Sequence, residues 1–281
     1  MALGAGGLPA GTVVLTLVAA VLHATWNAMA HGVPDRLVGF ALIGVSDMVI
    51  GGLAVLLLGS LPAEAWPFVF ASAALHVVYT LLLWTSYELG DFSQTYPVAR
   101  GVAPWVVAVI EVALGRHLPA LQLTGIVVIS AGLLALALGS GRATWPALAV
   151  AGATGLAIAG YTVIDAGAVS AVPVPVYAAW MFLLQGPVLP AIALLRRGRG
   201  LRGLRRSSLA AGLGGGLVSL LAYGLVLVAQ TSGATAAVAA LRETSVVFAA
   251  VIGAVFFKES LGVRRVVAAG IVAAGIVLVG L

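Results

Sequence analysis

Residues 37–59 read LVGFALIGVSDMVIGGLAVLLLG, an apolar run interrupted by a single ionisable residue, Asp47. A helix needs about 20 mainly apolar residues to cross the roughly 30 Å of hydrocarbon in a bilayer. This run is long enough, and similar runs recur along the whole chain. We therefore expect residues 37–59 to be one of several transmembrane helices.

Composition supports a membrane protein. The chain of 281 residues is 62% hydrophobic and 8% charged, whereas soluble domains are about 45–50% apolar and 25% charged. So few charges cannot cover a water-exposed surface of that size, so we expect the lipid bilayer to cover most of it. Cysteine is absent, which excludes a disulfide framework and a thiolate metal site.

Glycine, proline and charged residues divide the chain into apolar segments of spanning length. We predict an all-α membrane protein with ten transmembrane helices in a single transporter domain, 1–281. The predicted spans are 10–30, 37–59, 66–87, 93–114, 120–139, 145–166, 172–195, 208–230, 234–257 and 262–280.

The two halves of the chain resemble each other. Gly132 aligns with Gly275, an offset of about 143 residues, and 115–118 (GRHL) aligns with 258–261 (KESL). Repeat 1 covers about 1–140 and repeat 2 about 141–281, with five spans each. Because five is odd, the second copy must insert upside down, which predicts two inverted-topology repeats facing each other at the midplane.

The distribution of cations predicts the orientation. Odd-numbered linkers hold the arginine-rich loop 196–206 and nearly all other Lys and Arg outside the spans, whereas even-numbered linkers hold only Arg116. The positive-inside rule then places odd linkers in the cytoplasm and both termini on the other side of the inner (plasma) membrane. No aromatic residue interleaves with the arginines, so nucleic acid is not an expected partner despite the basic charge balance.

Polar side chains inside spans face the bundle interior or a wet cavity, because exposing them to lipid is costly. Their helical spacing gives stripes that predict a central cavity for a small-molecule substrate. The predicted substrate-binding residues are His23, Trp26, Asn27, His76, Tyr79, Tyr96, Arg100, Tyr161, Asp165, Tyr223, Arg242 and Glu243. The hinge candidates are Pro97, Pro104 and Pro187, since proline removes a backbone donor.

The leading candidates for binding a substrate carboxylate are Arg100 and Arg242, because guanidinium groups bind carboxylates through paired hydrogen bonds. Asp165 or Glu243 would then bind an ammonium group. The alternative is internal ion pairing: Arg242 with Glu243 or Asp165, and Arg100 with Glu111.

The two histidines, His23 and His76, could bind substrate, carry a proton or simply pack between helices. Together with Asp165 and Glu243, His23 permits coupling to protons without requiring it. No ligand spacing around the histidines suits a metal, and no cofactor is expected.

Three strings resemble the EamA-type branch of the drug/metabolite transporter superfamily. They are His23-Ala-Thr-Trp26-Asn27-Ala, residues 90–104 (GDFSQTYPVARGVAP), and Tyr161-Thr-Val-Ile-Asp165. The resemblance implies a ten-helix metabolite exporter with a central site. The chain departs from the family at 115–118, where Gly-Glu-Arg-Leu is usual, which weighs against a matched pair of acids at those turns. Small multidrug-resistance relatives carry a proton-coupling Glu on the first helix, whereas this chain has only His23 there.

These observations predict export of small metabolites, most of all amino acids, by alternating access. Proton-coupled efflux of cationic or aromatic drugs is the alternative, and it predicts a net negative cavity. A membrane-embedded enzyme is a distant alternative, because the sequence contains neither His-Glu-x-x-His nor Gly-x-Ser-x-Gly. We therefore do not expect an enzyme.

Overall fold

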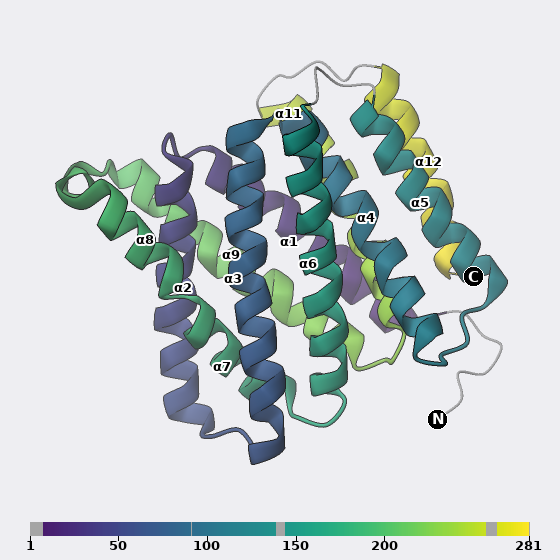
Figure 1. The fold of residues 1–281 in the computed structure, drawn as a ribbon, viewed down its shortest axis with the longest axis horizontal. Helices are drawn as coiled ribbons and strands as arrows, with labels where there is room; N and C mark the ends of the chain where they lie inside the picture. The colour runs from purple at the N-terminus through teal and green to yellow at the C-terminus, as the bar shows by residue number, and fades with distance from the viewer. Residues whose placement is uncertain (1–7, 91, 139–143, 257–262, 281) are drawn as a thin grey trace.

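The computed structural model describes residues 8–90, 92–138, 144–256 and 263–280, in which every regular element is helical (Figure 1). The α-helices are α1 (Ala10–His31), α2 (Arg36–Leu58), α3 (Trp66–Leu89), α4 (Phe92–Ala113), α5 (Ala120–Leu138), α6 (Trp145–Val169), α7 (Val174–Gln185), α8 (Val188–Arg197), α9 (Arg206–Gln230), α10 (Thr235–Arg242), α11 (Thr244–Phe256) and α12 (Val263–Gly280). Two short 3₁₀ helices, η1 (Ala63–Ala65) and η2 (Gly198–Gly203), lie in linkers.

The membrane character predicted from the sequence is confirmed. Within the described residues, 8 helical segments are long and apolar enough to cross a bilayer, and the segment Val266–Val279 is apolar but shorter. The outer surface carries large apolar side chains, with Leu56, Leu57 and Leu195 more than four-fifths exposed. Such a surface is stable in lipid rather than in water.

Two predicted spans are each divided into a pair of shorter helices. The span 172–195 breaks between α7 and α8 at Pro187, which has no N–H to continue the helix. The span 234–257 breaks between α10 and α11 at Glu243, where the backbone switches to i→i+3 hydrogen bonds. In contrast, α4 runs through Pro97 and Pro104 as one helix.

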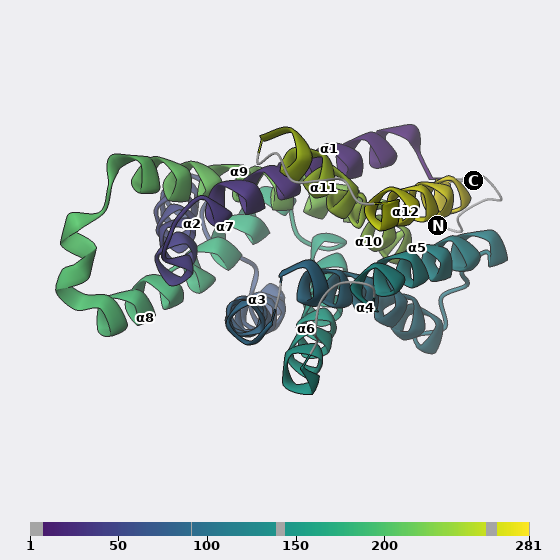
Figure 2. The ribbon, with the colours of Figure 1, turned by 90° about the horizontal axis from the view of Figure 1, so that it is seen from above.

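Helices from the two halves pack against each other throughout the bundle. The main contacts pair α1 with α9, α3 with α6, α4 with α6, α2 with α7 and α5 with α12. Figure 2 shows α1, α9, α11 and α12 along one side and α3, α4, α5 and α6 along the other, with α2 and α7 together at one end. This arrangement brings polar residues of both halves towards the middle.

Glycines make the closest helix crossings. A Cβ atom at Gly125 on α5 would lie 2.7 Å from the Gly275 carbonyl oxygen on α12, and one at Gly44 on α2 would lie 2.6 Å from the Gly186 carbonyl oxygen. In lipid the hydrophobic effect does not drive helices together. Close backbone packing at small residues therefore contributes much of the stability of helix association.

Candidate functional site

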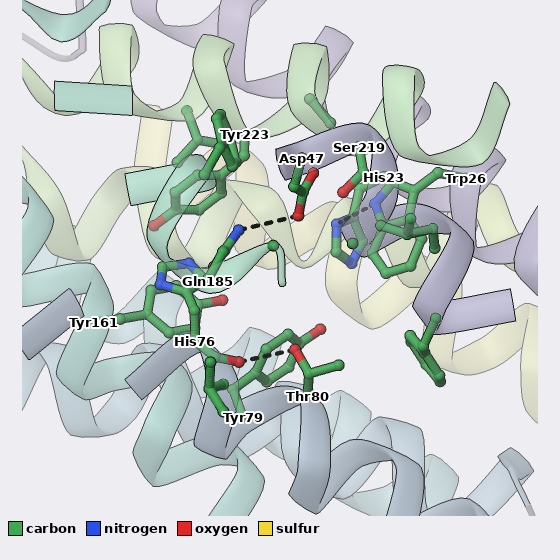
Figure 3. Close-up of a pocket in the computed structure, with 18 of the residues that line it drawn as sticks. His23, Trp26, Asp47, His76, Tyr79, Thr80, Tyr161, Gln185, Ser219 and Tyr223 are labelled. Carbon is green, nitrogen blue, oxygen red and sulfur yellow. Dashed lines mark hydrogen bonds between the residues drawn. The ribbon is translucent and has the colours of Figure 1, made fainter. Parts of the chain in front are cut away.

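A cavity lies between the two sides of the bundle, and its wall is built from α1, α2, α3, α4, α6, α7, α8, α9 and α10 (Figure 3). Of the predicted site residues, those in the wall are His23, Trp26, His76, Tyr79, Arg100, Tyr161, Tyr223 and Arg242. Asn27, Tyr96, Asp165 and Glu243 are not in the wall. Large apolar residues such as Phe40, Ile43, Phe182 and Leu189 complete it.

On α1, His23 and Trp26 are three residues apart, so their side chains lie on the same face of the helix and contact each other. The Trp26 indole Nε1–H donates to His23 Nδ1 at 3.2 Å, and the two rings meet edge to face. Because Nδ1 accepts this bond, the ring proton of a neutral His23 lies on Nε2. Asn27 donates to the His23 backbone oxygen at 2.8 Å, so its amide helps to fix the helix.

An aromatic cluster forms the opposite wall. His76 on α3 stacks on Tyr161 of α6 with ring centres 3.9 Å apart, and the ring of Tyr223 on α9 meets His76 edge-on at 5.0 Å. His76 Nδ1 lies 3.0 Å from the Ser72 backbone oxygen, which can only accept, so Nδ1 carries the proton. His76 Nε2 is then a buried acceptor with no partner among the described residues.

Asp165 lies behind this cluster instead of facing the cavity. Its carboxylate is fully buried and accepts hydrogen bonds from the Tyr177 hydroxyl at 2.6 Å and from the Tyr223 hydroxyl. The carboxylate therefore fixes the position of the Tyr223 ring in the wall.

The Arg100 side chain on α4 contacts the residues at the break between α10 and α11. Its Nε lies 2.8 Å from Glu243 Oε2, and its Nη2 donates to the Arg242 backbone oxygen at 3.1 Å and to Ser245 Oγ at 3.0 Å. The guanidinium thus supplies a donor to a carbonyl at the broken helix, where backbone partners are scarce. Internal pairing, one of the two predicted roles, is the one that the geometry supports for Arg100.

The predicted partner for Arg100, Glu111, was wrong. About three turns of α4, roughly 16 Å along its axis, separate the two residues. Glu111 instead pairs with Arg116 at 2.7 Å and accepts from the Ala236 backbone N–H at 3.0 Å.

Arg242 ends α10 with its guanidinium in the cavity wall, over the face of Tyr223 at 5.5 Å from the ring centre. The predicted ion pairs with Glu243 or Asp165 do not form: among the described residues, its side chain has no carboxylate within 4 Å. Arg242 is therefore a buried cation whose hydrogen-bond donors remain available to a solute.

Sequence reasoning gave no role to Asp47, which the structure places in the cavity wall on α2. Its Oδ2 accepts from Gln185 Nε2 at 3.2 Å, while Oδ1 is buried without a partner among the described residues. The signal in the sequence was an ionisable residue in the middle of a span. No group of three or more His, Cys, Asp or Glu in the described ranges could hold a metal ion.

Comparison with known proteins agrees with this architecture. The sequence profile of the EamA-like transporter family matches residues 145–281. The second half of the chain is therefore similar to EamA-like transporters. The resemblance noted from the sequence is thereby confirmed, and EamA-like proteins are membrane transporters of small solutes rather than enzymes.

A solved structure described as "Crystal structure of protein" extends the likeness to the first half. It is 16% identical, has a TM-score of 0.77, and the match covers 96% of this chain and 98% of that one. At this identity the likeness shows that the EamA-like half and the half before it share one fold with that protein. A comparison with curated proteins gives no match.

Proposed function

We propose that the chain is an alternating-access carrier that exports amino acids, with Arg242 binding the solute carboxylate. The observation that carries this proposal is a buried arginine that has no carboxylate partner among the described residues and faces a cavity lined mainly by apolar and aromatic side chains. A buried cation without a counter-ion is costly, so a bound anion stabilises it. A planar guanidinium matches a carboxylate through two parallel hydrogen bonds.

The rest of the wall suits an apolar side chain. Trp26, Phe40 and Phe182 offer large nonpolar surfaces close to the polar groups. Ligand sites of this kind are mostly apolar, with a few polar groups that orient the ligand. Neutral amino acids such as leucine are therefore the first solutes to test.

The packing of the helices supports ten spans arranged as two inverted repeats. A two-fold axis in the membrane plane would relate α1 to α6, α2 to α7–α8, α3 to α9, α4 to α10–α11 and α5 to α12. This axis requires the contact of α1 with α9 to have a counterpart in the contact of α6 with α3. It also requires α2 to pack against its own symmetry mate, α7, and α5 against its mate, α12. These pairs are among the main contacts of the bundle, so the two halves can rock about the shared cavity.

The linkers support the proposed orientation in the inner membrane. Arg197, the last residue of α8, pairs with Asp35 before α2 at 2.6 Å, and Arg196 lies over the Trp84 ring near the end of α3. Linkers 1, 3 and 7 therefore meet at one end of the bundle, the arginine-rich end. The positive-inside rule assigns that end to the cytoplasm.

Efflux of cationic drugs is less well supported. That reading requires a net negative cavity, whereas Arg100 and Arg242 both reach the wall and Arg242 already covers one face of Tyr223. A cationic drug would meet like charge there.

Counterflow in proteoliposomes tests the proposal. Vesicles loaded with unlabelled L-amino acids are diluted into the radiolabelled counterpart, beginning with L-leucine. We expect wild-type counterflow, and a KM about tenfold or more higher in Arg242→Gln, because a charge-assisted hydrogen bond is lost. The matched control is Arg205→Gln, an exposed linker residue. The proposal is wrong if no L-amino acid exchanges, or if Arg242→Gln behaves like Arg205→Gln.

A further inference from the structure

Asp47 is the acid of the cavity that the proposed function leaves unused. Its side chain is 93% buried, being only 7% exposed, yet one carboxylate oxygen has no partner among the described residues. Figure 3 shows Gln185 reaching from α7 to the other oxygen, which holds the carboxylate in the wall. A buried carboxylate needs a cation or a proton to offset the loss of hydration.

The backbone around Asp47 adds further acceptors. Gln185 is the last residue of α7, and the helix breaks directly after it. Because Pro187 and Pro190 have no N–H, the carbonyls of Leu183 and Gly186 lack the donors that a continuous helix would give them. The Gly186 oxygen lies close to Gly44 on α2, one turn before Asp47, because a Cβ at Gly44 would stand 2.6 Å from it. The C-terminal end of a half-helix also carries partial negative charge.

Within the described ranges, no fixed positive charge neutralises the Asp47 carboxylate and the acceptors around it. The other ionisable groups of the wall are His23 on α1, His76 and Tyr79 on α3, Arg100 on α4, Tyr161 on α6, Tyr223 on α9 and Arg242 on α10. In the described part of the chain, none of the cations among them lies within 4 Å of Asp47. Arg100 is already paired with Glu243.

We propose that Asp47, Gln185 and the carbonyls at the α7–α8 break form a subsite for the ammonium group of the solute. This inference rests on the proposed function and replaces Asp165 and Glu243 in that role. Asp165 is occupied by two tyrosine hydroxyls and Glu243 by Arg100, and neither lines the cavity. The wall then holds one anion-binding and one cation-binding group, which selects a solute that carries both charges.

Two competitors separate these subsites in L-leucine counterflow: 3-methylbutylamine has the ammonium group without the carboxylate, and 4-methylpentanoate has the carboxylate without the ammonium group. We expect Asp47→Asn to weaken inhibition by the amine about tenfold or more and to leave inhibition by the acid unchanged. Arg242→Gln should do the reverse. The control Glu64→Gln removes an exposed charge in η1 and should change neither. Equal effects of Asp47→Asn on both competitors overturn the subsite.

A second measurement needs neither a variant nor transport. Dicyclohexylcarbodiimide modifies buried carboxyl groups, and mass spectrometry locates the product. We expect 3-methylbutylamine to slow modification of Asp47 in purified wild-type protein, and the uncharged 3-methylbutanol not to. Equal protection by both compounds contradicts an ammonium site. In the counterflow assay described above, transport that stops when K⁺ replaces Na⁺ contradicts it as well. If leucine does not exchange at all but the amine alone protects Asp47, the proposed function fails while the subsite stands.

Discussion

At the scale of single residues, Arg100 and Arg242 each place a guanidinium group inside the bundle, but the two groups have different contacts. Arg100 bonds to three groups around the α10–α11 break, whereas the Arg242 side chain points into the cavity. Their places in the sequence, at corresponding positions of the two proposed repeats, do not distinguish these roles. The difference arises from Glu243, which follows Arg242 and has no acidic counterpart after Arg100.

The Arg100–Glu243 pair predicts a large effect from removing one partner. Glu243→Gln leaves the Arg100 guanidinium buried without a counter-charge, so we expect a loss of about 3 kcal/mol or more in the free energy of unfolding. Thermal unfolding in detergent measures it, with Glu64→Gln as the exposed control. In the double variant Arg100→Gln/Glu243→Gln the loss should be smaller than the sum of the single losses. Additive losses would show that the two side chains are not coupled.

The Asp35–Arg197 pair, at the end of the bundle, should contribute a small, pH-dependent amount to the free energy of unfolding. Partial desolvation raises its pKa, but the hydrogen bond from Arg197 and the backbone N–H of Val38 outweigh it and hold the pKa below the usual value. A lowered folded-state pKa means that the stabilisation is complete above the ordinary value of about 3.9 and is lost as the pH falls through the folded value.

Asp35→Asn isolates this effect, because asparagine can still cap α2. The pair is partly exposed, so we expect the variant to cost under about 1 kcal/mol at pH 7. The difference in unfolding midpoint should shrink in acid and in high salt. A difference that persists unchanged at pH 3 would assign the effect to something other than charge.

Helical spacing predicted part of the site and could not predict the rest. It grouped His23 with Trp26 and His76 with Tyr79, and both pairs line the cavity. It also included Asp165, which is turned behind Tyr223. Spacing gives the positions of side chains relative to each other on one helix, but the rotation of that helix within the bundle depends on its neighbours.

At the scale of elements, glycine crossings set how closely helices approach. A Cβ at Gly125 would lie 2.7 Å from the Gly275 oxygen, so Gly125→Ala must push α5 away from α12. We expect a loss of about 1–3 kcal/mol in unfolding stability. The control on the partner helix is Gly270→Ala, where the space is open and better helix propensity should leave stability equal or slightly higher. Similar stability of the two variants would refute close α5–α12 packing.

The helix boundaries followed the apolar runs, because crossing lipid requires a minimum length of apolar chain. The predicted span 37–59 became α2 at Arg36–Leu58. The break at Glu243 was not predicted, because the residues around it are ordinary helix formers. Glu243, the residue between α10 and α11, pairs with Arg100, which lies far away in the sequence.

At the scale of the whole molecule, the cavity exists only where the two halves meet. The aromatic wall combines His76 and Tyr79 of the first half with Tyr161 and Tyr223 of the second. The proposed subsites divide similarly: Arg242 comes from the second half and Asp47 from the first. A motion of one half against the other therefore changes both subsites together, as alternating access requires.

The natural absence of cysteine makes the orientation directly measurable. Glu64→Cys places one thiol in η1, directly before α3, and Arg205→Cys places one between η2 and α9. Because Arg196 lies over Trp84 near the far end of α3, the two thiols lie at opposite ends of the bundle. Because the arginine-rich end should face the cytoplasm, a membrane-impermeant maleimide should label Glu64→Cys in intact cells. It should label Arg205→Cys only after permeabilisation. The reverse pattern would invert the carrier. Labelling of both in intact cells would contradict the odd number of crossings, α3, α4, α5, α6 and α7–α8, that the ten-span arrangement places between them.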